Sequence, residues 1–425
     1  MKQLADLLTA RRTGPVDPVL AAAVVGLVGF GVVMVYSASL VEAVTVFRDP
    51  QHFLKRQALF AGVALAIMFG VSRMDYVRFR PLTYLGLLVV VFMMVLSVAG
   101  FGHTGGGAAR WLRLGPIHIQ PSEAAKLALV LWLGYSLDKK RERVKSFSLG
   151  MLPHFMMAGV LVLLCMKQPD FGGAAVLMFL TFSMLFVAGA RLQWLIGAAG
   201  LGAGFAVLAV RFTQYRWERM VAWFNMADHR QDLAYQPFQA VMSFGSGELT
   251  GMGLGGGLQV LYLPEAHTDF VAAIIGEELG FLGVLALCAV YLLIVVRGVR
   301  IAFAADDDYG SYIAFGISIM FGVQALVNLG VAMAILPTKG LTLPFVSYGG
   351  SSLLVNGLAM GILLSVSRRQ PAVENVRLDA GPRAEASAVL ASEAQFSATE
   401  PPVTEAQPKR REPKPRAPRA RKGGA

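Results

Sequence analysis

Charged side chains stand at or near the start of several apolar segments of this sequence. Glu123 and Lys126 lie three residues apart at the beginning of one segment, so on a helix they would share a face and could pair. Asp170 and Asp269 each directly precede another apolar segment. A charge beside or within a membrane helix is costly unless it is paired or wetted, and it therefore indicates a functional cavity. These groups are candidates for acid–base chemistry and for binding a charged substrate.

Each of these groups also has a purely structural interpretation. Glu123 and Lys126 can form a simple ion pair that stabilises the end of a helix. Asp170 and Asp269 can each cap the helix that follows, because a side-chain oxygen in that position accepts a hydrogen bond from a free backbone N–H. The sequence leaves both interpretations open.

A second cationic group, Arg110, precedes Glu123. Arg110 is followed by Trp111 and preceded by the glycine-rich residues 104–107. Arginine binds phosphate through two parallel hydrogen bonds and suits a pyrophosphate. An Arg-Trp pair taken alone is more often an anchor at the membrane surface.

Polar groups also interrupt the apolar pattern further along the chain. Glu277 and Glu278 lie two turns inside an apolar segment, so at least one of them must face protein or water. Residues 336–352 contain prolines and adjacent glycines, which a bilayer tolerates only where the backbone is covered or lines a cavity. The polar side chains that could line such a cavity are Lys339, Ser347 and Tyr348.

The composition sets these residues in a membrane. Of 425 residues, 55% are hydrophobic and 15% are charged, with a mean hydropathy of +0.57; soluble domains carry about 25% charged residues. The net charge of +11 does not indicate a nucleic-acid partner, because the basic residues fall in short loops and in a terminal tail. Cys165 and Cys288 lie inside apolar stretches, which supports neither a disulfide framework nor a metal cluster.

The apolar runs predict an all-α polytopic membrane protein with about ten transmembrane helices. The predicted spans are Val19–Leu40, Ala58–Val71, Leu82–Phe101, Ala124–Leu137, Phe155–Met166, Gly173–Ala190, Leu195–Val210, Phe270–Val296, Tyr312–Ile335 and Leu343–Val366.

The loops between these spans predict the orientation. Alternate loops are rich in Lys and Arg, which are retained on the cytoplasmic side, so both termini are expected inside. Residues 1–16 form a short cytoplasmic segment, and residues 17–369 form the transmembrane domain. Its large extracytoplasmic loop, residues 212–269, lies between the seventh and eighth spans and contains enough aromatic residues to pack. Residues 370–425 form a basic cytoplasmic tail that is expected to be disordered and could touch anionic lipid or a partner protein.

Four blocks of residues, in order, resemble the SEDS family of bacterial cell-wall proteins over about residues 17–369. The blocks are Arg110-Trp111 with Gln120 to Lys126, Gln168 to Gly172, Leu263 to Phe270 followed by Gly276 to Gly280, and Leu336 to Ser352.

This resemblance implies a peptidoglycan glycosyltransferase that polymerises lipid II at the outer face of the bacterial cytoplasmic (inner) membrane. The expected partners are lipid II and the growing glycan strand, membrane lipid, a class B penicillin-binding protein and other division proteins. The family's essential acid falls on Asp269, and its cavity falls on Glu123, Lys126 and Asp170. Ala266 and Gly276 favour the division branch of the family, and therefore the septum, over the elongation branch.

The expected mechanism assigns a role to each candidate. As general base, Asp269 would activate the acceptor sugar hydroxyl, giving inversion at the donor carbon with undecaprenyl pyrophosphate as leaving group. Cations would stabilise that leaving group; the candidates are Arg110, Lys126 and Lys339. A divalent cation, Mg²⁺ or Mn²⁺, could share this task. The other residues expected to bind substrate are Trp111, Glu123, Asp170, His267, Thr268, Ser347 and Tyr348.

Two other classes of function remain compatible with the sequence. A transporter that flips lipid II across the bilayer would also have ten spans with intramembrane charges. A non-enzymatic division scaffold could use the tail as its binding segment. Placement of the best acids on one side of the membrane favours catalysis over transport, because a transporter relay would cross the bilayer.

Overall fold

The computed structural model describes residues 14–105, 108–115, 117–338 and 340–369. The predictions made for Lys339, for the first 13 residues and for the tail from residue 370 lie outside these ranges.

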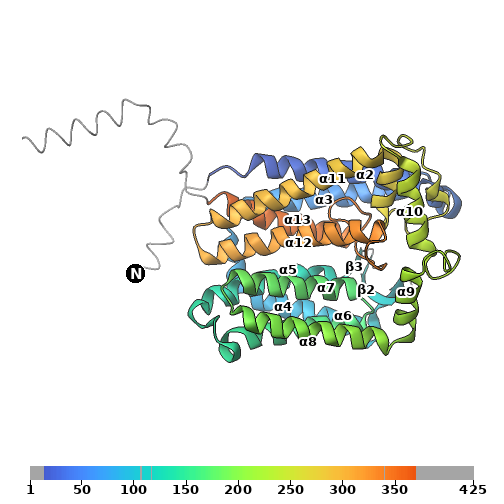
Figure 1. The fold of residues 1–425 in the computed structure, drawn as a ribbon. Helices are drawn as coiled ribbons and strands as arrows, with labels where there is room; N and C mark the ends of the chain where they lie inside the picture. Colours follow the sequence, from blue (N-terminus) through green and yellow to red (C-terminus); the bar gives the residue numbers. More distant parts are fainter. Residues whose placement is uncertain (1–13, 106–107, 116, 339, 370–425) are drawn as a thin grey trace, which may run out of the picture. The chain divides into compact units, whose positions relative to one another are not determined.

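Each of the ten predicted spans corresponds to an α-helix, which confirms the fold class (Figure 1). The helices are α2 (Pro18–Phe47), α3 (His52–Ser72), α4 (Phe79–Leu96), α5 (Pro121–Lys139), α6 (Leu152–Lys167), α7 (Phe171–Val187), α8 (Leu192–Arg211), α11 (Val271–Phe303), α12 (Asp308–Ala332) and α13 (Gly350–Ser367). By length and composition, 8 helices of the described chain can cross a membrane. The two not among them are α7, with 17 residues, and α5, which contains Glu123, Lys126, Asp138 and Lys139.

Several predicted boundaries are wrong for local reasons. The tenth helix begins at Gly350 and not at Leu343, because Phe345 has a φ of 67°, which a right-handed helix cannot contain. The first helix continues to Phe47, beyond the predicted end at Leu40. Its start matches the prediction closely, since Asp17 caps it by accepting a hydrogen bond from the Leu20 N–H at 2.9 Å.

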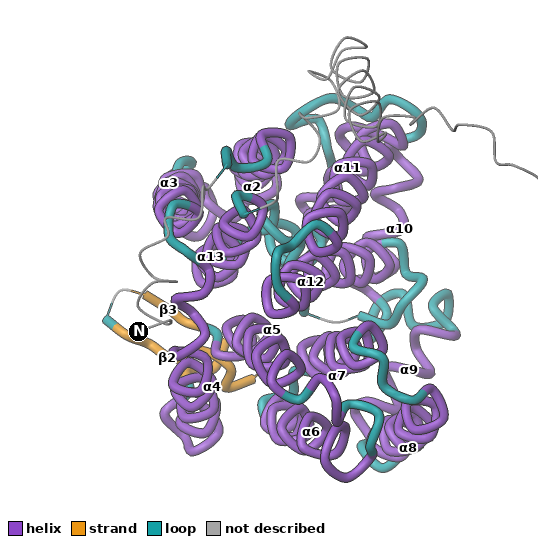
Figure 2. The backbone as a smooth tube through the Cα atoms, turned by 90° about the vertical axis from the view of Figure 1, so that its left-hand side faces the viewer, coloured by secondary structure: helices purple, strands orange, loops and turns teal. Residues whose placement is uncertain are grey.

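The helices lie side by side in one bundle, with α5, α12 and α13 near its centre and α8 at its edge (Figure 2). The burial of these helices agrees with this arrangement. In the most apolar 18-residue stretch of each helix, 78% of the residues are buried in α13 and 67% in α12, but only 6% in α8. Because lipid is as apolar as these side chains, the buried helices can carry the polar groups and the peripheral helices cannot.

Three short strands lie at one end of the bundle, between α4 and α5, and the apolar pattern did not predict them. They are β1 (His103–Gly105), β2 (Ala108–Leu114) and β3 (Ile117–Ile119), and they form an antiparallel sheet in the order β1-β2-β3. In the β2–β3 pair, Leu112 lies opposite Ile119, and Gly115, with a φ of 63°, lies in the connecting turn. This sheet fixes the segment that carries Arg110 immediately before α5.

The large loop is folded, as its aromatic residues indicated. It contains the helices α9 (Gln214–Phe224) and α10 (Tyr235–Gly247) and the short helix η5 (Gln259–Leu261). The Trp223 indole N–H donates to the Ala334 carbonyl at 2.8 Å, which ties α9 to the end of α12.

The segment after α10 inserts against a break in α11. Gly280 has a φ of 67°, and the chain on either side of it pairs with residues 248–253 through backbone hydrogen bonds. These include Met252 N–H to Glu277 O at 3.0 Å and Phe281 N–H to Glu248 O at 2.9 Å. The inserted backbone is thus covered, as a bilayer requires.

The acid pair in α11 is fully buried, which confirms that protein covers it. The Glu277 carboxylate accepts hydrogen bonds from the backbone N–H groups of Leu258 and Gln259, and the Ser37 hydroxyl donates to Glu278 at 2.5 Å. These two acids hold the inserted segment and helix α2, which gives them a structural role.

Candidate active site

Asp269 lies at the entrance of α11, outside the membrane-spanning part of that helix. The preceding turn begins at Glu265, whose φ is 58° and whose carbonyl accepts from the backbone N–H groups of Thr268, Asp269 and Phe270. This turn leaves the Asp269 side chain half-buried. A carboxylate in such a position is shielded from bulk water and can still meet a substrate.

Asn328 of α12 holds the backbone at this point. Its side-chain amide donates to the carbonyl of Asp269 at 3.0 Å and to the carbonyl of Leu341 at 2.6 Å. One buried amide therefore connects α12 to the start of α11 and to the loop that precedes α13.

Arg110 of β2 approaches the same place from the other side. A Cβ placed on Gly340 would lie 3.2 Å from Oδ2 of Asp269 and 3.3 Å from Nη1 of Arg110. The carboxylate and the guanidinium therefore both border the space that Gly340 leaves open. Within the described chain, the Arg110 Nε is buried without a hydrogen-bond partner. The Nη1 atom, which borders the space beside Gly340, is suited to bind an anionic substrate group.

Burial raises the pKa of Asp269 to about 7, and the neighbouring carboxylate of Glu265 acts in the same direction. Arg110 opposes this increase, and the charge of Asp170 adds to it as the smallest of these effects. Burial lowers the pKa of the adjacent His267, against the charges of Glu42 and Glu265. A carboxyl group with a pKa near 7 is well matched to general base catalysis at neutral pH.

Glu123 and Lys126 form the predicted ion pair, with the Lys126 Nζ at 2.7 Å from Glu123 Oε1. The side chains are only 4% and 1% exposed, so the pair is part of the bundle interior. Lys126 also donates to Gln324 of α12, and the Ser352 hydroxyl of α13 donates to Glu123 at 3.2 Å. The pair thus joins the three central helices, so the ion pair is present, and substrate binding by Glu123 and Lys126 stays a prediction.

Asp170 is the N-cap of α7, the second structural interpretation that the sequence left open. Its Oδ1 accepts from the Gly173 N–H at 2.8 Å, and its side chain is buried. The next residue, Phe171, supports the guanidinium of Arg216 from α9, which lies 4.0 Å above the ring. Capping fixes the start of α7 near the site, and the charge of Asp170 is felt at Asp269.

The remaining described candidates lie in the turn before Asp269, in the loop before α13 and on β2. His267 and Tyr348 pack in an aromatic cluster with Phe53, with ring centroids 4.6 Å apart for His267–Phe53 and 5.2 Å apart for Phe53–Tyr348. The hydroxyl of Ser347 is used inside its own loop, where it accepts from the Leu343 N–H at 2.8 Å. Thr268 donates to the Glu265 carboxylate at 2.8 Å. Trp111 is half-buried on β2, opposite His103.

Three polar residues at the site were missed by the sequence reasoning. Gln324 and Asn328 bind Lys126 and the Asp269 backbone, and Glu265 lies beside the Asp269 carboxylate. The sequence did contain a signal for Gln324 and Asn328, because two amide side chains four residues apart in an apolar span share one helix face.

The described residues contain no group of three or more His, Cys, Asp or Glu side chains that could hold a metal ion. Mg²⁺ is commonly held by one or two carboxylates together with substrate phosphates, so a role for a divalent cation stays a prediction.

The fold defines a multi-pass membrane protein, with Asp269, Arg110 and Glu265 gathered at one end of its helical bundle. Comparison with known families agrees with this: the family described as "Cell cycle protein", which comprises FtsW, RodA and SpoVE, matches residues 18–371. The chain belongs to this family, the SEDS proteins.

Curated relatives cover most of the chain. The "Probable peptidoglycan glycosyltransferase FtsW" of Geobacter metallireducens is 43% identical over 355 residues, which are 83% of this chain and 95% of that protein. The "Stage V sporulation protein E" of Bacillus subtilis is 38% identical over 363 residues, 85% of this chain and 99% of that protein.

Solved structures show the same architecture. The Rod shape determining protein RodA of Thermus thermophilus is 30% identical, with a TM-score of 0.62 over 84% of this chain and 97% of that one. A structure described as "Structural coordination of polymerization and crosslinking by a peptidoglycan synthase complex" has a TM-score of 0.68 and 30% identity, over 83% and 98%.

Proposed function

We propose that this peptidoglycan glycosyltransferase polymerises lipid II during cell division and that Asp269 is its general base. The activity is the one named for its FtsW relatives. The observation that carries the catalytic assignment is the position of Asp269: a half-buried carboxyl with a pKa of about 7, beside Arg110, at the entrance of α11.

The chemistry follows from that arrangement. The 4-hydroxyl of the acceptor sugar is a poor nucleophile, and a carboxylate that accepts its proton during attack contributes typically about 10²- to 10⁴-fold. A single carboxylate on the nucleophile side gives inversion at the anomeric carbon of the lipid-linked donor. The bond to undecaprenyl pyrophosphate then breaks, and the pyrophosphate leaves with the bonding electron pair.

Arg110 is best placed to stabilise the leaving pyrophosphate. The Nη1 atom of its guanidinium borders the same open space as the Asp269 carboxylate. Fixed cations next to a low-dielectric medium stabilise developing phosphate charge strongly. Lys126 is less accessible, because its ammonium is engaged by Glu123 and Gln324. We assign no step to a divalent cation.

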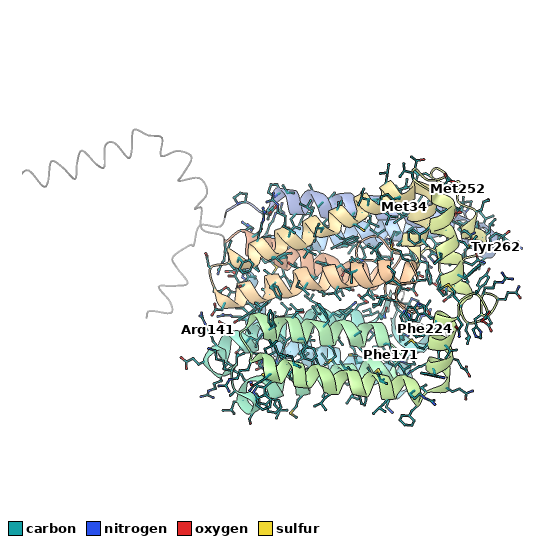
Figure 3. All side chains as sticks on the ribbon, in the orientation of Figure 1. Met34, Arg141, Phe171, Phe224, Met252 and Tyr262 are labelled. Carbon is teal, nitrogen blue, oxygen red and sulfur yellow. The ribbon has the colours of Figure 1, made fainter. Side chains whose placement is uncertain are left out.

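The proposed orientation places the Asp269 end of the bundle outside the cytoplasmic membrane. Arg141, from one of the loops rich in Lys and Arg, lies at the opposite end from Phe171 and the α9 region (Figure 3). Basic loops are retained in the cytoplasm, so both termini would be cytoplasmic. A division enzyme would then act at the septum, where lipid II is presented to the outer face.

The proposed partner is a class B penicillin-binding protein, which would crosslink the strands that this chain polymerises. The structural relative described as coordinating polymerization and crosslinking supports a complex of this kind. Other division proteins would bring the complex to the septum.

The test is a polymerisation assay with pure lipid II, with and without the cognate penicillin-binding protein. We expect glycan strands from the wild type in the presence of the partner, and none from Asp269→Ala or Asp269→Asn protein that remains folded in the membrane. Normal synthesis by Asp269→Ala would remove the catalytic assignment. Movement of labelled lipid II between leaflets without any lengthening of glycan would instead identify a flippase.

A further inference from the structure

A second polar site lies at the other end of the bundle from Asp269. The C-terminal ends of α3 and α13 and the chain that leads into α4 enclose a cavity of about 220 Å³. Four of its lining residues are arginines: Arg73, Arg78, Arg368 and Arg369. The only acid in the lining is Asp75. We call this cavity the arginine pocket.

One side of the arginine pocket is already fixed by protein contacts. Arg368 donates from Nη1 to the Ser72 carbonyl at 3.1 Å and from Nε to the Gly14 carbonyl at 3.3 Å. Arg369 pairs with Asp75 and lies 5.1 Å above the Tyr76 ring. The charge of Asp75 is thereby neutralised. This side of the arginine pocket is already ordered before a ligand binds.

The other two arginines have no such commitment. Within the described part of the chain, the side chains of Arg73 and Arg78 make no hydrogen bond or ion pair, and both residues are exposed. With Asp75 balanced by Arg369, the pocket retains the charges of Arg73 and Arg78 for a ligand. Arginines near the ends of membrane spans are retained on the cytoplasmic side, which explains why arginines occur at this end of the bundle. It does not explain why four of them meet at one hollow.

We propose that the arginine pocket binds the phosphate group of an anionic phospholipid headgroup from the cytoplasmic leaflet. Guanidinium groups bind phosphate oxygens through paired, charge-assisted hydrogen bonds. The pocket holds several times the roughly 30 Å³ that a water molecule occupies, so a phosphate group fits. A headgroup is favoured over free phosphate because the pocket lies where membrane-crossing helices end, at the level of the lipid surface.

The test is titration of the purified full-length chain in neutral detergent, followed by native mass spectrometry. The ligands are short-chain phosphatidylglycerol, short-chain phosphatidylcholine and inorganic phosphate. We expect one saturable site for phosphatidylglycerol, with at least about tenfold preference over phosphatidylcholine, as two cations near the surface would give.

The variant pair separates the pocket from general surface charge. Arg73→Gln and Arg78→Gln should each weaken binding about fivefold, and the double variant about thirtyfold. The matched control is Arg143→Gln with Arg191→Gln, which removes two exposed arginines elsewhere in the chain, outside the pocket lining. Binding to this control should stay within about twofold of wild type.

The outcomes are distinct. Inorganic phosphate that binds as tightly as phosphatidylglycerol, with the same loss in the double variant, would support the anion site and assign it to free phosphate. Equal weakening in the control, or no saturable binding of either anion, would overturn the proposal. Because the basic tail is present in all variants, its contribution cancels. The single variants keep the test valid if the double variant is unstable.

Discussion

The side-chain amide of Asn328 donates to the backbone carbonyl of Asp269 at 3.0 Å. Its second hydrogen goes to the Leu341 carbonyl at 2.6 Å, so both N–H donors of the amide are used. Asn328 does not face the substrate through these bonds. It is a positioning residue that fixes the backbone of Asp269, the proposed base, and the backbone of the loop at Leu341.

Replacement of Asn328 by Ala should therefore reduce kcat more than it changes KM. A misplacement of about 1 Å can cost about 10²-fold in rate, and we expect a loss of roughly 10- to 100-fold in glycan polymerisation. Asn356→Ala is the matched control, because Asn356 is also a buried amide but, within the described residues, donates only to the Ser352 hydroxyl at 3.3 Å. A kcat within about twofold of wild type, together with a lowered Tm, would make Asn328 merely structural.

Gly340→Ala should impair activity without unfolding the chain. The new methyl group would enter the space bordered by Asp269 and Arg110, at 3.2 and 3.3 Å from their polar atoms. We expect a fall of about tenfold or more in kcat/KM, because the space is where the reacting groups must meet.

Gly349→Ala in the same loop provides the control. Its Cβ would meet Ser352 and Thr342 at 3.6 Å, which is ordinary van der Waals contact, and its φ of 172° suits any residue. Equal loss of activity in both variants would mean that the loop, and not the space beside Asp269, is sensitive.

The polymerisation rate should rise with pH through about 7. A base must be ionised to accept a proton, and burial raises the pKa of Asp269 to about 7, so the active form increases as the pH passes that value. Glu265→Gln removes a neighbouring negative charge that raises this pKa, and should move the rising limb to lower pH. A profile of kcat/KM against pH for the two proteins measures the shift. If the rising part of the Glu265→Gln profile does not move, or moves to higher pH, the group that titrates is not Asp269.

The Glu123–Lys126 pair can be tested by a double-mutant cycle. Lys126→Met leaves Glu123 charged in the bundle interior, which should destabilise the protein by about 3–5 kcal/mol. The double variant Glu123→Gln with Lys126→Met should recover much of the Tm and part of the activity, since no unpaired charge remains. A double variant that is stable but inactive would instead show that Lys126 contacts substrate.

The apolar runs predicted the ten helices of the bundle and their order, because a segment that crosses a hydrocarbon layer must be long and apolar. They did not predict α9 and α10 in the large loop. They did not determine boundaries that depend on backbone conformation. The start of α13 at Gly350 follows from a positive φ at Phe345, and the break of α11 at Gly280 follows from the segment that pairs with it. The pairing joins residues about 30 positions apart, which a local pattern does not contain.

At the site, the sequence alone determined which acids and bases stand at span ends, and the resemblance of the motif blocks predicted that Asp269 is the essential acid. Local chemistry was enough for the Glu123–Lys126 pair and for the Asp170 cap, since each needs only neighbours within one helical turn. Only the tertiary structure decided that Asn328 holds Asp269 and that Gly340 leaves room between Asp269 and Arg110. These relations join α12, α11, β2 and the loop before α13, and the positions of such distant segments are set by the packing of the whole bundle.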